Sequence, residues 1–566
     1  MNPTNTGRLP AKALDMMDWQ WSQYEAHFKE LSSRQLSPAN INAFMADWSR
    51  LHELADEVGS RLYVAKDVNT ADKDAETRFL AFVENVAPKL QEAEQALKSK
   101  LLESKLVPAN FELPLKKMQT EAALYRDENL PLFVEQTKTG TEYAKIVGSQ
   151  TVQWEGKEVT VSQLAPVFQD TDRQRREQAW RAATDRRLAD RAALNELWVK
   201  LLDIRLKIAE NAGYDDYRSY RWLDMLRFDY TPENCKTFHR AIEKVVVPAA
   251  ARILERRRQR LGLDKLRPWD TEVDTSGRPA LTPFATTPEF TAGVERILTK
   301  VDAGLGDHFK LMVKENLLDL ENRKNKAPGG YCTGFEAARR PFIFMNSVGI
   351  HQDVMTLVHE SGHACHSFES FALPYFQQRG VNLEFAEVAS MGMELLAAPY
   401  FERSQGGFYS AEDARRVMVD NLEKNVLFWP YMAVVDGFQH WVYENAAKAK
   451  DPVNCDRTWT ELWQRFMPVT DWSGFEAALE TGWHRKLHIY EVPFYYVEYG
   501  LAQLGASQVW ANALKDQASA VAAYKRSLAL GGTKSLPELY AAAGARFAFD
   551  AGTLGTIIEL IESKIG

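Results

Sequence analysis

The chain has 566 residues, enough by length alone for three or four average domains and for a large buried core. Its hydrophobic content of 45% and charged content of 26% are ordinary for a soluble globular protein. A net charge of −8 argues against a surface that binds polyanions, so no nucleic-acid partner is expected.

Cysteine use and hydropathy predict where the protein works. The cysteines are scattered and form no CxxC pair, so a disulfide framework is not expected; they are Cys235, Cys332, Cys365 and Cys455. The first residues lack the apolar segment of a secretory signal. No stretch reaches the roughly eighteen uninterrupted apolar residues of a membrane helix. These features predict a cytoplasmic protein without a membrane partner.

The first half of the chain is predicted to be mostly helical. Residues 12 to about 135 have the pattern of long amphipathic helices, interrupted near prolines. A hairpin is expected over residues 151–161, where two alternating segments flank Gly156. Helices then resume at residue 170, and one from residue 192 to 211 is expected to end before Gly213. No internal repeat is evident.

A basic run and a strand follow. Residues 256–260 contain four arginines, which we interpret as the solvated end of a helix rather than a nucleic-acid patch. Pro341–Asn346 is predicted to be a short strand, and proline at its start suits an edge strand. An extended peptide could add to such an edge, with Phe342 and Phe344 as candidate substrate contacts. The alternative is an ordinary covered edge.

The strand leads into the segment His359-Glu360-Ser361-Gly362-His363, an HExxH pattern on a predicted helix. Positions four apart share a helix face, so His359 and His363 can direct two imidazoles at one zinc ion. Glu360 lies beside that point, where it can take a proton from a metal-activated water. The alternative is two ordinary histidines on one helix.

A catalytic zinc needs a third protein ligand. Glu384, Glu387 and Glu394 lie on the next predicted helix, which runs to about Phe401. Glu387 and Glu394 are seven residues apart and nearly share a face, so one could bind the metal while the other orients a ligand histidine. Glu384 is close to that face as well, and spacing alone does not choose among the three.

Two of these segments together resemble a known family. The run from His359 to His366, followed by Phe385-Ala386-Glu387-Val388-Ala389-Ser390-Met391, is similar to the thimet oligopeptidase and oligoendopeptidase F family of zinc peptidases, family M3. The resemblance implies one zinc ion per chain, with His359, His363 and Glu387 as its ligands. It also matches Glu394 to the family's second glutamate.

A third block, from His488 to Tyr499, resembles the family's segment of a histidine followed by tyrosines. The resemblance implies that His488, Tyr496 and Tyr499 stabilise the oxyanion that forms on the substrate carbonyl. Val492-Pro493-Phe494 stands where the thimet branch has glycines, so the chain is closest to the oligoendopeptidase F branch.

The resemblance also implies a fold. It is a mainly α, zincin-like fold of the neurolysin type, in which two helical lobes flank a deep substrate channel and a small β-sheet lies beside the active-site helix. Residues 1–195 would form an N-terminal helical region, similar to the oligopeptidase F N-terminal region from about residue 110. Residues 196–566 would form the catalytic domain.

The expected activity is zinc-dependent endopeptidase hydrolysis of short unstructured oligopeptides, with Glu360 as general base. One alternative is a zinc carboxypeptidase or dipeptidyl carboxypeptidase of related helical fold, which would need a cation for the substrate C-terminus. Another is a helical peptide-binding protein that retains the metal site without catalysis. The peptide preference and the oligomeric state stay open.

Overall fold

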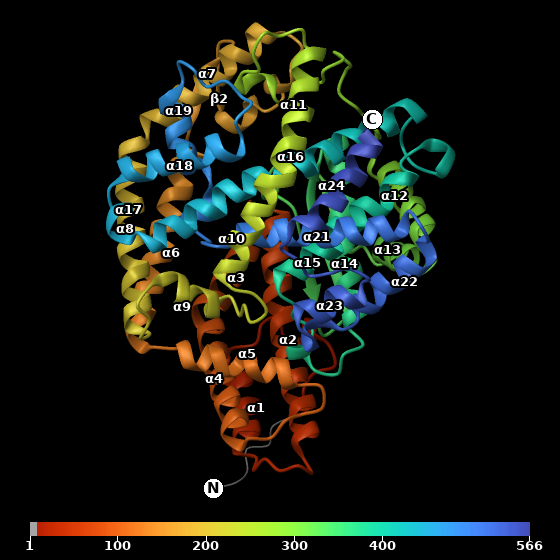
Figure 1. The fold of residues 1–566 in the computed structure, drawn as a ribbon. Helices are drawn as coiled ribbons and strands as arrows, with labels where there is room; N and C mark the ends of the chain where they lie inside the picture. Colours follow the sequence, from red (N-terminus) through yellow and green to blue (C-terminus); the bar gives the residue numbers. More distant parts are fainter. Residues whose placement is uncertain (1–7, 566) are drawn as a thin grey trace. The chain divides into compact units, whose positions relative to one another are not determined.

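The computed structural model describes residues 8–565, and most of this part of the chain is helical (Figure 1). The prediction of a mainly α fold is therefore confirmed. The chain divides into two compact units, each built from three separated stretches. The first unit comprises residues 8–123, Ala280–Val417 and Ala502–Phe547, and the second comprises Leu124–Pro279, Met418–Leu501 and residues 548–565.

The first unit is formed by helices and one small sheet. Its helices are α1 (Trp21–Ser33), α2 (Ile41–Val68), α3 (Lys73–Asn85), α4 (Ala87–Ser104), α5 (Glu112–Leu124), α12 (Thr287–Val301), α13 (Ala303–Lys314), α14 (His351–Ser370), α15 (Leu383–Ala397), α22 (Gln517–Leu528) and α23 (Leu536–Ala542). One buried core joins the N-terminal helices α1, α2 and α4, with Trp48 wholly inside it. The α14 and α15 helices lie side by side (Figure 1).

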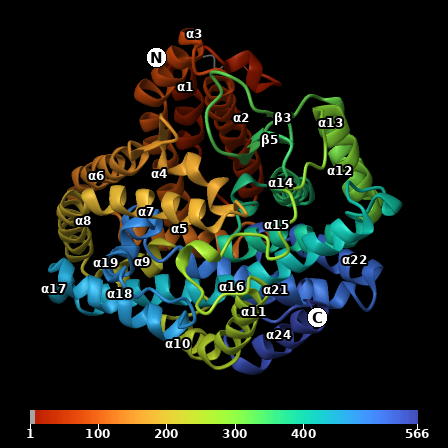
Figure 2. The same cartoon turned by 90° about the horizontal axis from the view of Figure 1, so that it is seen from above.

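The sheet of the first unit is close to α14 in Figure 2. It consists of β3 (Leu318–Glu321), β5 (Arg340–Ser347) and β4 (Tyr331–Phe335), in that order. Strand β5 pairs in parallel with β3 and antiparallel with β4. The predicted strand is thus present, but the prediction that it lies at an edge is wrong. Pro341 is the second residue of β5 and lies opposite Gly334, so its missing N–H affects only the end of the ladder.

The second unit is also helical, with one hairpin. Its helices are α6 (Leu130–Gly148), α7 (Arg173–Ala189), α8 (Arg191–Asn211), α9 (Tyr217–Asp224), α10 (Pro232–Ala241), α11 (Val247–Arg260), α17 (Ala446–Ala449), α18 (Pro452–Phe466), α19 (Glu476–Glu480), α20 (Leu487–Tyr490) and α24 (Ala551–Ile565). Two further helices, α16 (Ala411–Glu444) and α21 (Tyr496–Ala513), contribute residues to both units.

The hairpin of the second unit confirms the sequence prediction. Strands β1 (Thr151–Trp154) and β2 (Lys157–Thr160) pair antiparallel across a two-residue turn. Glu155 and Gly156 in this turn both have positive φ, at 50° and 79°. Two consecutive positive φ angles match the right-handed twist of the flanking strands, which is why glycine suits the second position.

The chain boundary predicted at residue 195 falls within α8 and inside the second unit, so it does not separate the compact units. As a division between family regions it stays a prediction. Among the described helices, none combines the length and the apolar character that crossing a bilayer requires.

Candidate metal centre

The helix that carries the HExxH segment has a well-defined start. Asp353, in the first turn of α14, accepts hydrogen bonds from the backbone N–H groups of Val348, Gly349 and Ile350, at 2.8, 2.8 and 3.0 Å. Gly349 has φ of 92°, a conformation that costs little only for glycine. A carboxylate here also interacts favourably with the helix dipole. The entry from β5 into α14 is therefore fixed before the metal-binding turn begins.

Helix α15 approaches α14 very closely at the HExxH turn. A Cβ atom on Gly362 would lie 2.5 Å from the Ala389 carbonyl oxygen and 2.6 Å from the Ser390 Cα atom. No side chain fits at that distance, so glycine at the fourth position of the motif permits the contact. Small residues on α15 complete it, and the close approach brings the α15 glutamates to the two histidines.

The structure gathers His359, His363 and Glu387 into one group, whose candidate ligand atoms all lie within 4.8 Å of one another. Glu387 Oε2 is 3.5 Å from His359 Nε2 and 3.9 Å from His363 Nε2. Ligand atoms of a tetrahedral zinc site lie about 3.3 Å apart, given metal–ligand bonds of about 2.0–2.1 Å. The donor set of two imidazoles and one carboxylate thus fits a zinc ion with small side-chain movements.

Two further side chains orient these ligands. Glu394 Oε1 is 2.6 Å from His359 Nδ1, which places the ring hydrogen on Nδ1 and leaves the Nε2 lone pair directed at the ligand group. Ser390 donates to Glu387 Oε2 at 2.9 Å. The assignment of Glu394 as the residue that holds a ligand histidine is consistent with this geometry.

The two histidines of the candidate ligand group have strongly shifted pKa values. Burial disfavours the charged form of His359, but the hydrogen bond and charge of Glu394 outweigh it and raise the pKa of His359 to about 9. Burial and the nearby His359 lower the pKa of His363 to about 3. A metal ion that binds here must therefore displace a proton from His359. His363 is already neutral and can offer its lone pair to the metal directly.

Glu360 lies beside the ligand group and is largely buried, with 9% of its surface exposed. Burial raises the pKa of Glu360; His359 opposes this shift, and the Glu387 charge adds to it. The backbone N–H of Cys332 on β4 hydrogen-bonds the Glu360 carboxylate. A carboxyl with a raised pKa beside a candidate metal group is well matched to proton transfer near neutral pH.

A second group that could hold a metal lies in the second unit. Cys235, Asp436 and His440 place ligand atoms within 4.8 Å of one another. However, Arg218 Nη1 is 3.4 Å from His440 Nδ1, and a guanidinium can only donate. His440 Nε2 then carries the ring hydrogen and lies 3.3 Å from Asp436 Oδ2, while His239 Nε2 is 2.8 Å from the same oxygen. Among the described residues, neither His440 Nε2 nor Asp436 Oδ1 makes a hydrogen bond, and the Arg218 contact places a positive charge beside His440.

The second unit gathers the predicted oxyanion donors. The His488 ring centroid is 4.9 Å from that of Tyr496 and 6.0 Å from that of Tyr499. Burial and the Lys486 charge lower the pKa of His488 to about 4, so its imidazole is neutral at pH 7. Lys486 donates to the Tyr496 hydroxyl at 2.8 Å, and its own pKa is lowered to about 8 by burial and by Arg485.

The start of the tyrosine helix α21 is held by unusual backbone geometry. Phe494 has φ of 66°, which is uncommon for a bulky residue. Its N–H donates to Gln439 Oε1 at 2.6 Å, and its carbonyl accepts from Arg227 Nη2 at 2.5 Å. Arg227 also pairs with Glu498 at 2.7 Å, inside the same helix turn as the tyrosines. These contacts stabilise the strained residue and fix the direction in which α21 begins.

Comparison with known proteins identifies the family. The sequence profile of peptidase family M3 matches residues 167–557, well over half of the chain. The chain belongs to peptidase family M3. Oligoendopeptidase F homologues of Borreliella burgdorferi and Mycoplasma pneumoniae are similar to this M3 chain, at 22% identity over 43% of it and 27% over 49%. The resemblance to the oligoendopeptidase F branch is thus confirmed.

The extent of similarity differs between sequence and structure. The M3 chain covers only 42% and 46% of the lengths of those two relatives. A solved structure of PZ peptidase A with an inhibitor has a similar fold throughout, with a TM-score of 0.84 and 26% identity. That similarity covers 100% of this chain and 99% of the other.

The remaining predicted site residues of this M3 chain are placed differently. Phe342 and Phe344 are 7% and 0% exposed and pack against Phe335 and Tyr331 in the sheet. Side chains so buried do not reach a substrate, and we do not retain them as substrate contacts. Glu384, the third candidate left open by spacing, is wholly buried and does not belong to the ligand group.

Sequence reasoning missed several residues that support the predicted site residues of each unit. Asp353, Ser390 and Lys486 each hold a helix start or a predicted site residue by a hydrogen bond. Asp353 carried a signal, since an acidic residue in the first turn is typical of helix starts. Nothing local distinguishes Lys486 from an exposed lysine, because its partner Tyr496 lies ten residues away on another helix.

Proposed function

We propose that this M3 chain is a zinc-dependent endopeptidase that hydrolyses short, unstructured oligopeptides. The observation that carries the proposal is the donor set of α14 and α15. One candidate ligand atom from each of His359, His363 and Glu387 converges on a single point. Glu360 directly follows His359 in the chain. Two imidazoles and a carboxylate that converge on one point favour a bound cation, which takes the place of the His359 proton.

The chemistry divides between the ion and the chain. Zinc held by these three residues supplies Lewis acidity, which acidifies water and polarises a peptide carbonyl. Glu360 accepts the proton of the attacking water and then passes it to the leaving amine. Burial of Glu360 supports this role, because its raised pKa brings proton uptake and release closer to neutral pH.

The oxyanion donors belong to the same proposal. His488, Tyr496 and Tyr499 come together within the second unit, and His488 is kept neutral by burial. We infer that the phenol hydroxyls, with His488, donate hydrogen bonds to the carbonyl oxygen as it gains charge. Lys486 acts through Tyr496, whose hydroxyl it hydrogen-bonds, and is a positioning residue.

Peptide binding by strand addition is retained in a modified form. Strand β4, not β5, is an outer strand of the three-stranded sheet, and its Cys332 N–H reaches Glu360. An extended peptide that adds to β4 would run past the general base. This assignment, a substrate channel and a cytoplasmic location all belong to the proposal.

The test is cleavage of an end-blocked, internally quenched peptide, with and without a chelator. We expect cleavage that is lost with the chelator and restored by zinc. An endopeptidase cuts the blocked peptide, whereas a carboxypeptidase or dipeptidyl carboxypeptidase requires the free C-terminus. No metal-dependent turnover of any peptide in a random mixture would instead favour a non-catalytic binding protein.

A tyrosine substitution tests the oxyanion assignment. Tyr499→Phe should lower kcat by about 10²–10³-fold with little change in KM, because one oxyanion donor is worth about 3–4 kcal/mol in the transition state. Tyr495→Phe, whose ring centroid is 5.2 Å from that of Tyr499, is the matched control. A larger effect of the control on kcat, measured with the same peptide, would overturn the choice of Tyr499.

A further inference from the structure

A small cavity in the second unit is lined by two arginines that pair with no acidic side chain in the described part of the chain. The cavity has a volume of about 120 Å³ and lies between α6, α7, α8 and the 3₁₀ helix Thr481–Arg485. Arg187 and Arg485 line it, together with the indole rings of Trp180 and Trp472. No carboxylate is among its lining residues.

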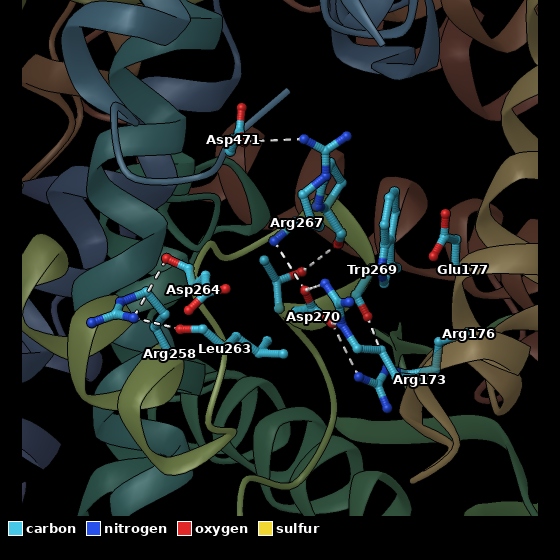
Figure 3. Close-up of polar contacts among 12 residues, drawn as sticks. Arg173, Arg176, Glu177, Arg258, Leu263, Asp264, Arg267, Trp269, Asp270 and Asp471 are labelled. Carbon is cyan, nitrogen blue, oxygen red and sulfur yellow. Dashed lines mark hydrogen bonds and ion pairs between the residues drawn. The ribbon is translucent and has the colours of Figure 1, made fainter. Parts of the chain in front are cut away.

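The absence of a counter-charge is specific to this position. Helix α7 carries six arginines, and five of them pair with a carboxylate. These pairs are Arg173–Asp270, Arg175–Asp170, Arg176–Asp270, Arg181–Glu177 and Arg186–Asp190. Figure 3 shows two of them, with Arg173 and Arg176 directed at Asp270. Arg187 makes no such pair within residues 8–565.

The two guanidinium groups are close enough to repel one another. Burial and the charge of Arg485 lower the pKa of Arg187 to about 10, with no carboxylate acting in the opposite direction. Arg187 is half-buried and Arg485 is exposed, so the positive charge extends from the surface into the cavity. Two like charges held together without compensation are unfavourable unless an anion joins them.

Residues with hydroxyl groups line the same space. Ser162 and Thr184 add hydroxyl groups to the lining. The Thr481 hydroxyl, by contrast, already donates to the Ala477 carbonyl at 2.7 Å. The cavity therefore presents cations and unused donors to a ligand that can accept several hydrogen bonds.

We propose that this cavity binds a small oxyanion, a phosphate or a carboxylate, held by Arg187 and Arg485. The cavity has room for such an anion. Guanidinium groups bind carboxylate and phosphate through paired, charge-assisted hydrogen bonds. The ligand's source is either free phosphate or the terminal carboxylate of a peptide-like molecule. The proposal does not depend on the peptidase activity.

The test compares anion binding by the full metal-loaded chain and its variants, by calorimetry and by thermal unfolding. The probes are inorganic phosphate, N-acetylglycine and its uncharged amide, at constant ionic strength set with chloride. Arg187→Gln and Arg485→Gln should each weaken binding by at least about tenfold, since one charge-assisted hydrogen bond contributes that much. Arg181→Gln, which removes a paired charge from the same helix, is the control and should bind as the parent chain does.

Thermal unfolding distinguishes an arginine that binds an anion from one that only supports the fold. Phosphate or N-acetylglycine should raise Tm for the parent chain and the control but not for Arg187→Gln. Without anion, Arg187→Gln should unfold at the same Tm or higher, because an uncompensated charge is removed. The exposed Arg485→Gln gives the answer independently if Arg187→Gln does not fold.

The outcomes decide both the site and its ligand. Binding of N-acetylglycine but not its amide assigns a terminal carboxylate, and binding of phosphate alone assigns free phosphate. Equal affinities in the parent chain, Arg187→Gln and Arg485→Gln would overturn the proposal. So would the absence of any binding beyond that of chloride.

Discussion

Two regions of this chain bury a carboxylate, and the two carboxylates differ in how many hydrogen bonds they accept from the protein. Asp270, which is wholly buried, accepts from Arg173 Nε and Nη2, from Arg176 Nη2 and from the Arg267 backbone N–H, at 2.9, 2.9, 3.1 and 3.0 Å (Figure 3). These bonds use the full accepting capacity of a carboxylate. Glu387 at the candidate metal centre has one side-chain donor, Ser390, and otherwise faces imidazole nitrogens.

The difference shows how the fold marks a site for a ligand. A buried carboxylate whose oxygens are all satisfied by protein donors holds elements together and has nothing left to bind. A buried carboxylate that faces imidazoles can instead bind a metal ion, which displaces the proton held by His359. The Arg187 cavity shows the converse, with unmatched positive charge.

The largest expected effect is a loss of turnover at the candidate metal centre without a loss of metal. Glu360→Gln should lower kcat by about 10³–10⁴-fold, because it removes the group that transfers the proton. It should leave the metal content unchanged, since the substitution spares all three ligand side chains. Peptide turnover and zinc content after dialysis measure the two quantities. Normal turnover in this variant would remove the general-base assignment.

The second-largest expected effect is at Asp270, the carboxylate whose oxygens are fully hydrogen-bonded. Asp270→Asn should lower the free energy of unfolding by about 3–5 kcal/mol, because it leaves Arg173 and Arg176 without their counter-charge. Zinc affinity should be unchanged. Glu177→Gln, which removes the half-buried partner of the exposed Arg181, should cost no more than about 1 kcal/mol. Denaturant unfolding of both variants gives the comparison, and equal losses would show that Asp270 is not the more important partner.

The smallest expected effect is at Glu394, which hydrogen-bonds the candidate ligand His359. Glu394→Gln should weaken zinc binding by about 10–100-fold, because the Nδ1–H of His359 loses a charged acceptor. Competition with a chelator of known affinity measures it. Glu412→Gln, an exposed glutamate in the first turn of α16, is the control. An affinity unchanged from the parent chain would mean that Glu394 does not orient His359.

What the sequence by itself determined is local. The β1–β2 hairpin follows from alternation around Gly156, and the α14 helix with its two histidines follows from apolar spacing. The four-residue spacing of His359 and His363 is enough to place both on one face, because helix geometry is fixed. The resemblance in these short segments was likewise sufficient to indicate family M3.

Only the tertiary structure decided which partners meet. Spacing could not choose among Glu384, Glu387 and Glu394, and the close approach of α15 at Gly362 separates their roles. The central position of β5 and the lack of a partner for Arg187 were equally invisible in the sequence. Periodicity reports which face a residue occupies, whereas the neighbour across that face comes from a distant segment through packing.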